Sequence, residues 1–213
     1  MAMSANPRRA LVVIDVQNEY VSGDLPIEYP PIETSLANIG RAIDAARAAG
    51  VPVVVMQNFA PADSPLFARG SVGAELHPVV ASRERDHYVE KALPSAFAGT
   101  DLKAWLTDRG IDTLTVVGYM THNCDASTVF EATHAGLAVE FLADATGSVP
   151  YANEAGTASA EEIHRVFSAV MHTRFAAVVN TDAWLAAVEQ GVPLARDNIY
   201  ASNQRARATR VPA

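Results

Sequence analysis

Cys124, the only cysteine of the chain, is the residue best suited to nucleophilic chemistry. It stands just past a short apolar run, at the start of a segment with helical periodicity that extends to Ala135. Unpaired backbone N–H groups and the positive end of a helix dipole favour the thiolate form at such a position, and a neighbouring lysine acts in the same direction. Cys124 is therefore a candidate nucleophile, the alternative being a small, inert, buried residue.

Two other polar residues occupy comparable positions. Asp15 ends the apolar run that begins at Ala10, and Lys91 ends the short run that begins at His87. Taken singly, such an aspartate is often a turn residue and such a lysine is often a solvated surface charge. Asp125 opposes thiolate formation at its neighbour, because a second negative charge raises the pKa of a thiol. The sequence therefore leaves the resting protonation state of the cysteine open.

The elements that would position these residues alternate between strand-length apolar runs and longer stretches of helical periodicity. We predict six strands, at residues 10–15, 51–56, 87–91, 113–117, 138–142 and 175–179. We predict helices at residues 34–49, 101–109, 124–135, 159–172 and 182–189. Strands separated by helices form parallel sheets through right-handed crossovers. The predicted fold class is α/β: a three-layer α/β/α sandwich with a six-stranded, mainly parallel, Rossmann-like sheet.

In this fold the three polar residues fall at one edge of the sheet. Asp15 and Lys91 end their predicted strands, and Cys124 follows the fourth strand. Ligands of open parallel sheets bind in the crevice beyond the carboxyl ends of the strands. The prediction therefore brings together residues that are far apart in the sequence.

The length and the tail of the chain suggest one domain with an extension. A chain of 213 residues is long enough for one hydrophobic core and short for two. We expect one domain over residues 1–190. Residues 191–213 contain four arginines, and their periodicity is weak. We expect this tail to be either an arm that packs on a partner subunit or a frayed terminus.

Charge and hydropathy argue against several classes of partner. A formal net charge of −8 disfavours binding to nucleic acid. The longest apolar runs are too short to span a bilayer, and no apolar signal region follows Arg8 and Arg9. We therefore expect a cytoplasmic protein that does not bind a membrane. One cysteine also excludes an internal disulfide and a multi-thiolate metal site within one chain.

Three segments resemble the signature blocks of the isochorismatase-like cysteine hydrolases. They are LVVIDVQNEY from Leu11, EKALPSAF from Glu90, and VVGYMTHNCDASTVFEATHAGL from Val116. They occur in the family's order, and the similarity extends over about residues 8–180. The family includes nicotinamidases, N-carbamoylsarcosine amidases, ureidoacrylate amidases and streptothricin hydrolases. The resemblance therefore implies hydrolysis of a C–N bond in a small amide, carbamoyl or ureido compound through a thioester intermediate.

The resemblance also implies a role for each matching residue. Asp15 would be the general base and acid, Lys91 the cationic partner, and Cys124 the nucleophile. The peptide bond between Tyr119 and Met120 would be cis, and the backbone N–H groups of Met120 and Cys124 would form the oxyanion hole. The family further implies a homo-oligomer, either a dimer or a tetramer.

The chain departs from the nicotinamidases of the family at their metal-binding stretch. Those enzymes carry an Asp-x-His pattern after the second strand, where this chain has Gln57 and Asn58. Neutral amides replace imidazole poorly at a zinc site, which argues against nicotinamidase activity. None of the six histidines stands in a metal-ligand motif. We expect neither a metal nor another cofactor.

The substrate pocket is the least readable part of the sequence. His122 could replace Asp15 as the base of a Cys–His enzyme, but we favour a role in shaping the pocket. The residues that we predict to line the pocket are Asn18, Phe59, Phe67, Phe97, Tyr119 and His122.

Other functions have to be weighed against the hydrolase. A non-catalytic small-molecule-binding or interaction protein could retain the fold, but the complete set of Asp15, Lys91 and Cys124 argues against it. True isochorismatases cleave a vinyl ether and lack the nucleophilic cysteine, so Cys124 argues against that chemistry as well. No G-x-G-x-x-G follows the first strand, which excludes a Rossmann dehydrogenase.

Overall fold

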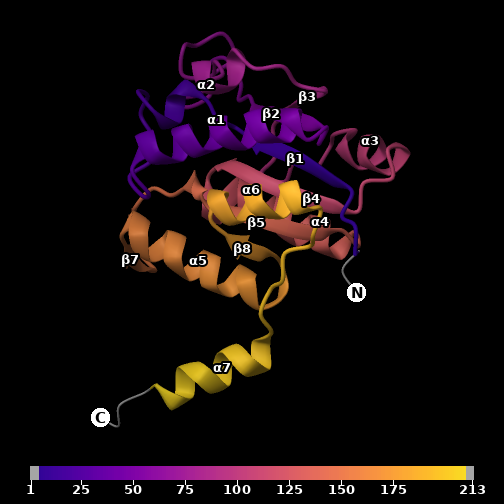
Figure 1. Ribbon diagram of the computed structural model, residues 1–213. Coiled ribbons are helices and arrows are strands. Elements are labelled where there is room, and N and C mark those ends of the chain that lie inside the picture. Colours follow the sequence, from indigo (N-terminus) through magenta and orange to yellow (C-terminus); the bar gives the residue numbers. More distant parts are fainter. Residues whose placement is uncertain (1–4, 210–213) are drawn as a thin grey trace.

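The computed structural model describes residues 5–209, and a six-stranded parallel sheet lies between two layers of helices (Figure 1). The strands pair in the order β3-β2-β1-β4-β5-β8. Their bounds are β1 (Arg9–Ile14), β2 (Val53–Asn58), β3 (His87–Lys91), β4 (Thr113–Tyr119), β5 (Ala138–Gly147) and β8 (Ala177–Val179). Every adjacent pair is parallel. This confirms the predicted three-layer α/β/α fold class.

Helices cover both faces of the sheet. Their bounds are α1 (Ile32–Ala48), α3 (Leu102–Asp108), α4 (Ala126–His134), α5 (Ala160–Arg174) and α6 (Thr181–Gln190). Side chains of α1 and α6 pack with Leu11 and Val13 of β1 on one face. Side chains of α3, α4 and α5 pack with Val12 and Ile14 on the other. Alternate residues of the central strand therefore serve two cores, which is why its sequence is almost continuously apolar.

Predicted boundaries differ from the observed ones by a few residues. β1 ends at Ile14, so Asp15 lies directly after the strand and adopts a left-handed conformation with φ of 51°. Aspartate tolerates this conformation better than most residues. The second strand is shifted to residues 53–58, and the sixth begins at Ala177.

Several short elements were not predicted. They are η1 (Asn18–Tyr20), α2 (Pro78–Ala81), β6 (Tyr151–Asn153), β7 (Gly156–Ala158) and α7 (Ile199–Ala208). β6 and β7 form an antiparallel hairpin outside the main sheet. None of the described helices is both long and apolar enough to cross a membrane.

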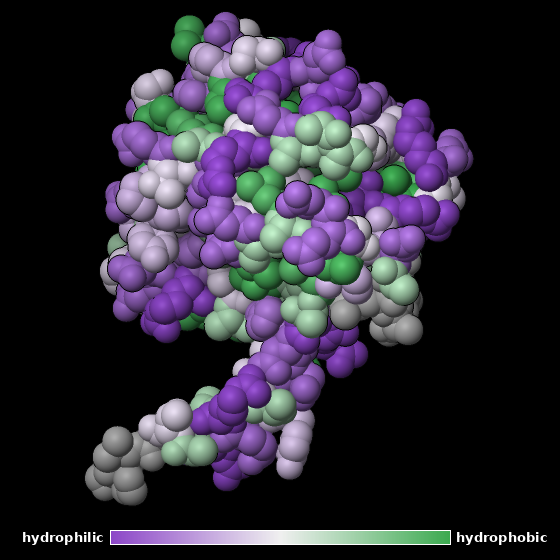
Figure 2. All heavy atoms as spheres, in the orientation of Figure 1, coloured by the Kyte–Doolittle hydropathy of each residue, from purple (hydrophilic) through white to green (hydrophobic). Residues whose placement is uncertain are grey.

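The predicted tail contains helix α7, which extends away from the body of the molecule (Figures 1 and 2). Asn198 caps it, with Oδ1 accepting a hydrogen bond from the Ala201 N–H at 2.8 Å. Residues 199–208 therefore form a regular helix, and a contact of this tail with a partner subunit stays a prediction. Residues 1–4 and 210–213 lie outside the described part. No residue of this helix, as the structure describes it, is buried.

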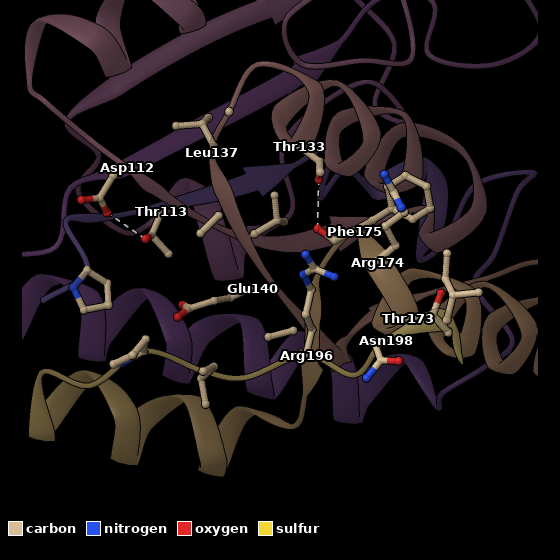
Figure 3. Close-up of a pocket in the computed structure, with 18 of the residues that line it drawn as sticks. Asp112, Thr113, Thr133, Leu137, Glu140, Thr173, Arg174, Phe175, Arg196 and Asn198 are labelled. Atoms are coloured by element: carbon tan, nitrogen blue, oxygen red, sulfur yellow. Dashed lines mark hydrogen bonds between the residues drawn. The ribbon is translucent and has the colours of Figure 1, made fainter. Parts of the chain in front are cut away.

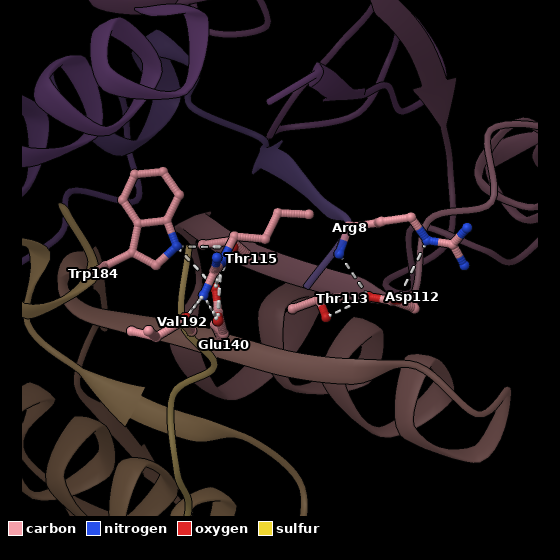
Figure 4. A network of polar contacts seen from close by, with 8 residues as sticks. Arg8, Asp112, Thr113, Thr115, Glu140, Trp184 and Val192 are labelled. Carbon is pink, nitrogen blue, oxygen red and sulfur yellow. Dashed lines mark hydrogen bonds and ion pairs between the residues drawn. The ribbon is translucent and has the colours of Figure 1, made fainter. Parts of the chain in front are cut away.

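A buried polar network joins the root of this arm to the amino-terminal part of the sheet (Figure 4). The Arg9 guanidinium donates to Glu140 Oε1 at 2.8 Å and to the Val192 carbonyl at 2.5 Å. Thr115 and Trp184 donate to Glu140 Oε2 at 2.9 Å each. Because every charge in this network has partners, the network stabilises the buried ion pair between Arg9 and Glu140.

Candidate active site

The carboxyl ends of three parallel strands bring the predicted catalytic residues together. Asp15 follows β1, Lys91 is the last residue of β3, and Cys124 follows β4. β1 lies between β2 and β4 in the sheet, so chain segments that leave β1 and β4 start side by side. This is the type of position at which open α/β sheets bind ligands.

Gly118 permits the close approach of β4 to β1 just before the nucleophile. It pairs with Ile14 and has a φ of +117°. A Cβ atom at this position would lie 2.0 Å from the Ile14 carbonyl oxygen. Only glycine therefore fits here, and the close approach places the chain after β4 next to Asp15.

Cys124 lies in a π-helical turn, η2 (Thr121–Asp125), that leads into α4. The prediction that it begins a regular α-helix is therefore wrong by two residues, since α4 begins at Ala126. The Tyr119–Met120 peptide bond that precedes this turn is cis. The Met120 carbonyl accepts hydrogen bonds from the Asn123 and Asp125 N–H groups at 3.0 and 3.2 Å, which closes the turn.

The three side chains form a compact buried cluster. Lys91 Nζ lies 2.6 Å from Asp15 Oδ2 and donates to Cys124 Sγ at 3.3 Å. The Lys91–Asp15 contact is a short, buried ion pair, in which Coulomb attraction holds the two groups together. Asp15, Lys91 and Cys124 are 0%, 4% and 6% exposed. The cysteine is therefore the most accessible of the three.

Burial and mutual charge shift the pKa of each group in this cluster. Burial raises the pKa of Asp15, although the Lys91 ammonium opposes this shift. Burial lowers the pKa of Lys91, but Asp15 and Cys124 outweigh it, and the net shift is upward. Burial and the Asp15 charge raise the pKa of the Cys124 thiol above its usual range. The shifts therefore favour a charged ammonium at Lys91 and a neutral thiol at Cys124.

Asp125, which follows Cys124 in the chain, is fully buried. Neither of its carboxyl oxygens has a hydrogen-bond partner among residues 5–209. Burial, reinforced by the charge of Asp15, raises its pKa well above the ordinary value. The neutral acid is therefore favoured, and it removes most of the repulsion that the sequence led us to expect between Asp125 and a thiolate.

The predicted pocket residues separate into two groups. Phe59 donates its backbone N–H to the Lys91 carbonyl at 2.9 Å, and Phe97 belongs to the same buried cluster as Cys124. Tyr119 and Phe67 instead lie in the core on the other face of the sheet, where both contact the Tyr20 ring. Since Tyr119 is fully buried and its hydroxyl bonds Ser35 at 2.7 Å, its side chain does not face an open pocket.

The two polar pocket residues also differ. Asn18 donates from Nδ2 to the Val72 carbonyl at 3.1 Å and anchors the loop there. His122, two residues before Cys124, contacts Ser148 and Tyr151, which the sequence analysis did not identify. Ser148 directly follows β5, and Tyr151 is the first residue of β6 in the exposed hairpin. No local sequence pattern points to either residue.

The large groove shown in Figure 3 is not lined by Asp15, Lys91 or Cys124. Its volume is about 550 Å³, and it is lined by the first residues of β4, β5 and β8 and by residues of the arm such as Arg196 and Asn198. It therefore lies at the opposite edge of the sheet from Asp15, Lys91 and Cys124. Among residues 5–209, no group of three or more His, Cys, Asp or Glu side chains is placed to hold a metal ion.

Comparisons with known proteins identify the family. A Burkholderia xenovorans LB400 protein assigned to the isochorismatases is 77% identical, and its crystal structure matches with a TM-score of 0.95 over 95% of this chain and 98% of that one. The uncharacterised isochorismatase family protein YddQ of Bacillus subtilis is 30% identical over 83% of this chain and 98% of its own. The ureidoacrylate amidohydrolase RutB of Methylobacterium radiotolerans is 31% identical over 86% of this chain and 80% of its own. The family model described as the isochorismatase domain matches residues 9–184, and the chain therefore belongs to the isochorismatase family.

Proposed function

We propose that this protein is a cysteine hydrolase that cleaves a C–N bond in a small amide, carbamoyl or ureido substrate. The observation that carries the proposal is the position of Lys91 Nζ, 2.6 Å from Asp15 Oδ2 and 3.3 Å from Cys124 Sγ. A base, a cation and a nucleophile within contact distance are the groups that acyl transfer requires.

The first half of the reaction forms a thioester. Asp15 accepts the proton of the Cys124 thiol while the sulfur attacks the substrate carbonyl carbon. The backbone N–H groups of Met120 and Cys124 stabilise the resulting oxyanion, an effect worth roughly 3 kcal/mol for one donor in other enzymes. Asp15 then gives its proton to the departing amine as the C–N bond breaks.

The second half regenerates the thiol. Asp15, again a carboxylate, accepts a proton from water as the water oxygen attacks the thioester carbonyl. The acid product leaves, and the proton returns to the Cys124 sulfur. Lys91 keeps its charge throughout and offsets the negative charge that moves between Asp15 and Cys124.

The pKa shifts suit these roles. A raised pKa makes the Asp15 carboxylate a stronger base than an exposed aspartate, and Lys91 keeps it ionised. The raised pKa of Cys124 means that the proton leaves as attack begins instead of beforehand. The substrate class is supported by the relationship to RutB, which acts on ureidoacrylate.

The test is hydrolysis across a panel of small amides, carbamoyl and ureido compounds. We expect turnover by the native protein, loss of at least about 1000-fold in Cys124→Ala, and an acyl adduct on Cys124 detectable by intact mass. Lys103→Gln, a change at an exposed position of helix α3, is the control and should retain full activity.

Other outcomes would point elsewhere. Equal turnover by the native protein and Cys124→Ala would contradict the mechanism. Binding of panel compounds by both proteins, with no turnover by either, would favour a small-molecule-binding protein that has retained the fold.

A further inference from the structure

His122, which lies in the same π-helical turn as Cys124, forms a polar contact with Tyr151 of β6. His122 Nε2 lies 3.0 Å from the Tyr151 hydroxyl, and His122 Nδ1 lies 3.2 Å from the Ser148 hydroxyl. The imidazole also meets the Tyr151 ring edge-to-face, with centroids 5.1 Å apart. Tyr151 is 42% exposed, whereas Cys124, Lys91 and Asp15 are 6%, 4% and 0% exposed.

The protonation of His122 determines what Tyr151 can offer to a ligand. Burial lowers the pKa of His122 to about 4, so its imidazole is neutral at pH 7 and carries one N–H. If Nε2 carries the proton, it donates to Tyr151 and leaves the tyrosine O–H free to donate. If Nδ1 carries it, Tyr151 donates to Nε2, and the free lone pairs of the tyrosine oxygen can accept. In either tautomer one hydrogen-bonding position of Tyr151 remains open.

Tyr151 also lies within electrostatic range of the nucleophile. Its pKa is raised by burial and by the negative charge of a Cys124 thiolate. The hydroxyl is therefore neutral at pH 7, like His122 and Ser148, and this side of the site carries no formal charge. An uncharged polar group is the natural partner for such a surface, because an anion would find no counter-charge on it.

We propose that Tyr151 is a specificity-determining residue whose hydroxyl hydrogen-bonds an uncharged carbamoyl or ureido group of the substrate, and that His122 positions this hydroxyl. The inference deepens the proposed function and rests on it for the identity of the substrate. The hydroxyl belongs to the β6–β7 hairpin, which is outside the main sheet, so it can differ between relatives without disturbing the sheet that holds the catalytic cluster.

The single cysteine allows a test that does not need turnover. Covalent modification of Cys124 at neutral pH, alkylation by the iodo reagents or mixed-disulfide formation by a thiosulfonate, can be followed by intact mass with no background from other thiols. Iodoacetamide carries an uncharged carboxamide, iodoacetate carries a carboxylate, and methyl methanethiosulfonate carries neither. We expect Tyr151→Phe to slow modification by iodoacetamide about fivefold, the effect of one hydrogen bond, and to change the other two rates less than twofold. Lys103→Gln, on the exposed face of α3, is the control.

A double-mutant cycle tests the positioning role of His122. We expect His122→Leu to slow the iodoacetamide reaction as Tyr151→Phe does, and the double variant to be no slower than either single variant. His122→Gln keeps a hydrogen-bonding group towards Tyr151 and should restore the rate to within about twofold. If His122 only maintained the local structure, His122→Leu would instead slow the reactions of all three reagents with Cys124 to a similar extent.

The outcomes separate this inference from the proposed function. Three results would overturn the inference. In the first, Tyr151→Phe slows the reactions of all three reagents equally; in the second, it does not slow the iodoacetamide reaction. In the third, the effects of the two single variants add in the double variant. If hydrolysis depends on Cys124 but Tyr151→Phe has no selective effect on iodoacetamide, the proposed hydrolase function stands and the proposed role of Tyr151 fails. If Tyr151→Phe slows iodoacetamide selectively but no panel compound is hydrolysed, the proposed recognition role of Tyr151 stands and the proposed hydrolase function is contradicted.

Discussion

Asp125 is a fully buried acid that the proposed reaction does not use. Its two oxygens lack hydrogen-bond partners among the described residues, and its pKa is raised well above the ordinary value of 3.8, first by burial and then by Asp15. A group with a raised folded-state pKa stabilises the fold fully below its unfolded pKa, and this contribution is lost as the pH rises towards the folded pKa. At neutral pH, Asp125 therefore lowers the free energy of unfolding relative to a residue of the same shape that does not ionise.

Asp125→Asn keeps the shape of the neutral acid and removes the ionisation. We expect its stability relative to the native protein to rise above pH 3.8, with a limiting slope of about 1.4 kcal/mol per pH unit. Urea unfolding at several pH values from acid to neutral measures this slope. Asp63→Asn, a change at an exposed site, is the control and should show no such trend.

The same variant tests the protonation state during catalysis. Because asparagine mimics the neutral carboxyl, Asp125→Asn should stay within about threefold of native activity on the panel compounds, the range of a minor packing change. A loss of about 100-fold, with the fold intact, would show that an ionised Asp125 takes part in the reaction.

Only part of the site could be predicted from sequence. Asp15, Lys91 and Cys124 stand at the ends of apolar runs, and the resemblance of three blocks gave each a proposed role. Tyr151 left no such signal, because a tyrosine in a short exposed segment is common. Its relation to Cys124 arises from a long-range contact with His122, 29 positions away, which no local pattern encodes.

At the scale of elements, the end of β4 controls the position of the nucleophile. Gly118 pairs with Ile14, and a Cβ atom there would lie 2.0 Å from the Ile14 carbonyl oxygen. A larger residue must separate β4 from β1, and the separation would move η2 away from Asp15. The distance between Lys91 Nζ and Cys124 Sγ thus depends on a residue with no functional side chain.

Gly118→Ala should therefore lose both stability and activity. Backbone strain and overpacking together predict destabilisation of about 2–4 kcal/mol, and we expect hydrolysis to fall at least about tenfold. Urea unfolding and panel assays measure the two effects. Gly50→Ala also has a positive φ but meets no atom within 4 Å, so it should cost only about 1 kcal/mol and leave activity unchanged. Similar results for the two variants would contradict the close-approach argument.

The predictability of the elements follows from how much each is buried. β1, β2 and β4 could be predicted as strands because both faces of the sheet are covered, almost every residue is buried and each strand has a continuous apolar run. The β6–β7 hairpin is mostly exposed and has no alternating pattern to reveal it. The π-helical turn at Cys124 was missed because its shape follows from the close packing at the end of β4, which local sequence does not report.

At the scale of the whole molecule, α7 lies apart from the body and carries a charge opposite to it. Four of the 16 basic residues of the chain follow Gly191, but only one of the 24 acidic residues does. Ile199 and Tyr200, at the start of the helix, are 53% and 74% exposed. A basic helix with exposed apolar side chains complements the acidic surface of a second copy of this chain, and we expect the arm to contact one.

Truncation after Ala195 tests this expectation. The shortened chain keeps the hydrogen bond between Arg9 and the Val192 carbonyl and loses only residues that contribute little to the core. We expect its melting temperature to stay within a few degrees of the native value, because no residue of α7, as described in the structure, is buried. Light scattering should show an oligomer for the native chain and a smaller species for the truncated one.

Salt and single substitutions separate charge from shape in this contact. In about 1 M salt the Debye length is ~3 Å, so a contact that depends on the arginines should weaken, and the native chain should shift towards the smaller species. Arg207→Gln, in α7, should weaken assembly at moderate salt, whereas Lys103→Gln, a change at an exposed position of α3, should not. If the native and truncated chains had the same oligomeric state in every buffer, the arm would not be an assembly contact, and the exposed face of α7 would need a different partner.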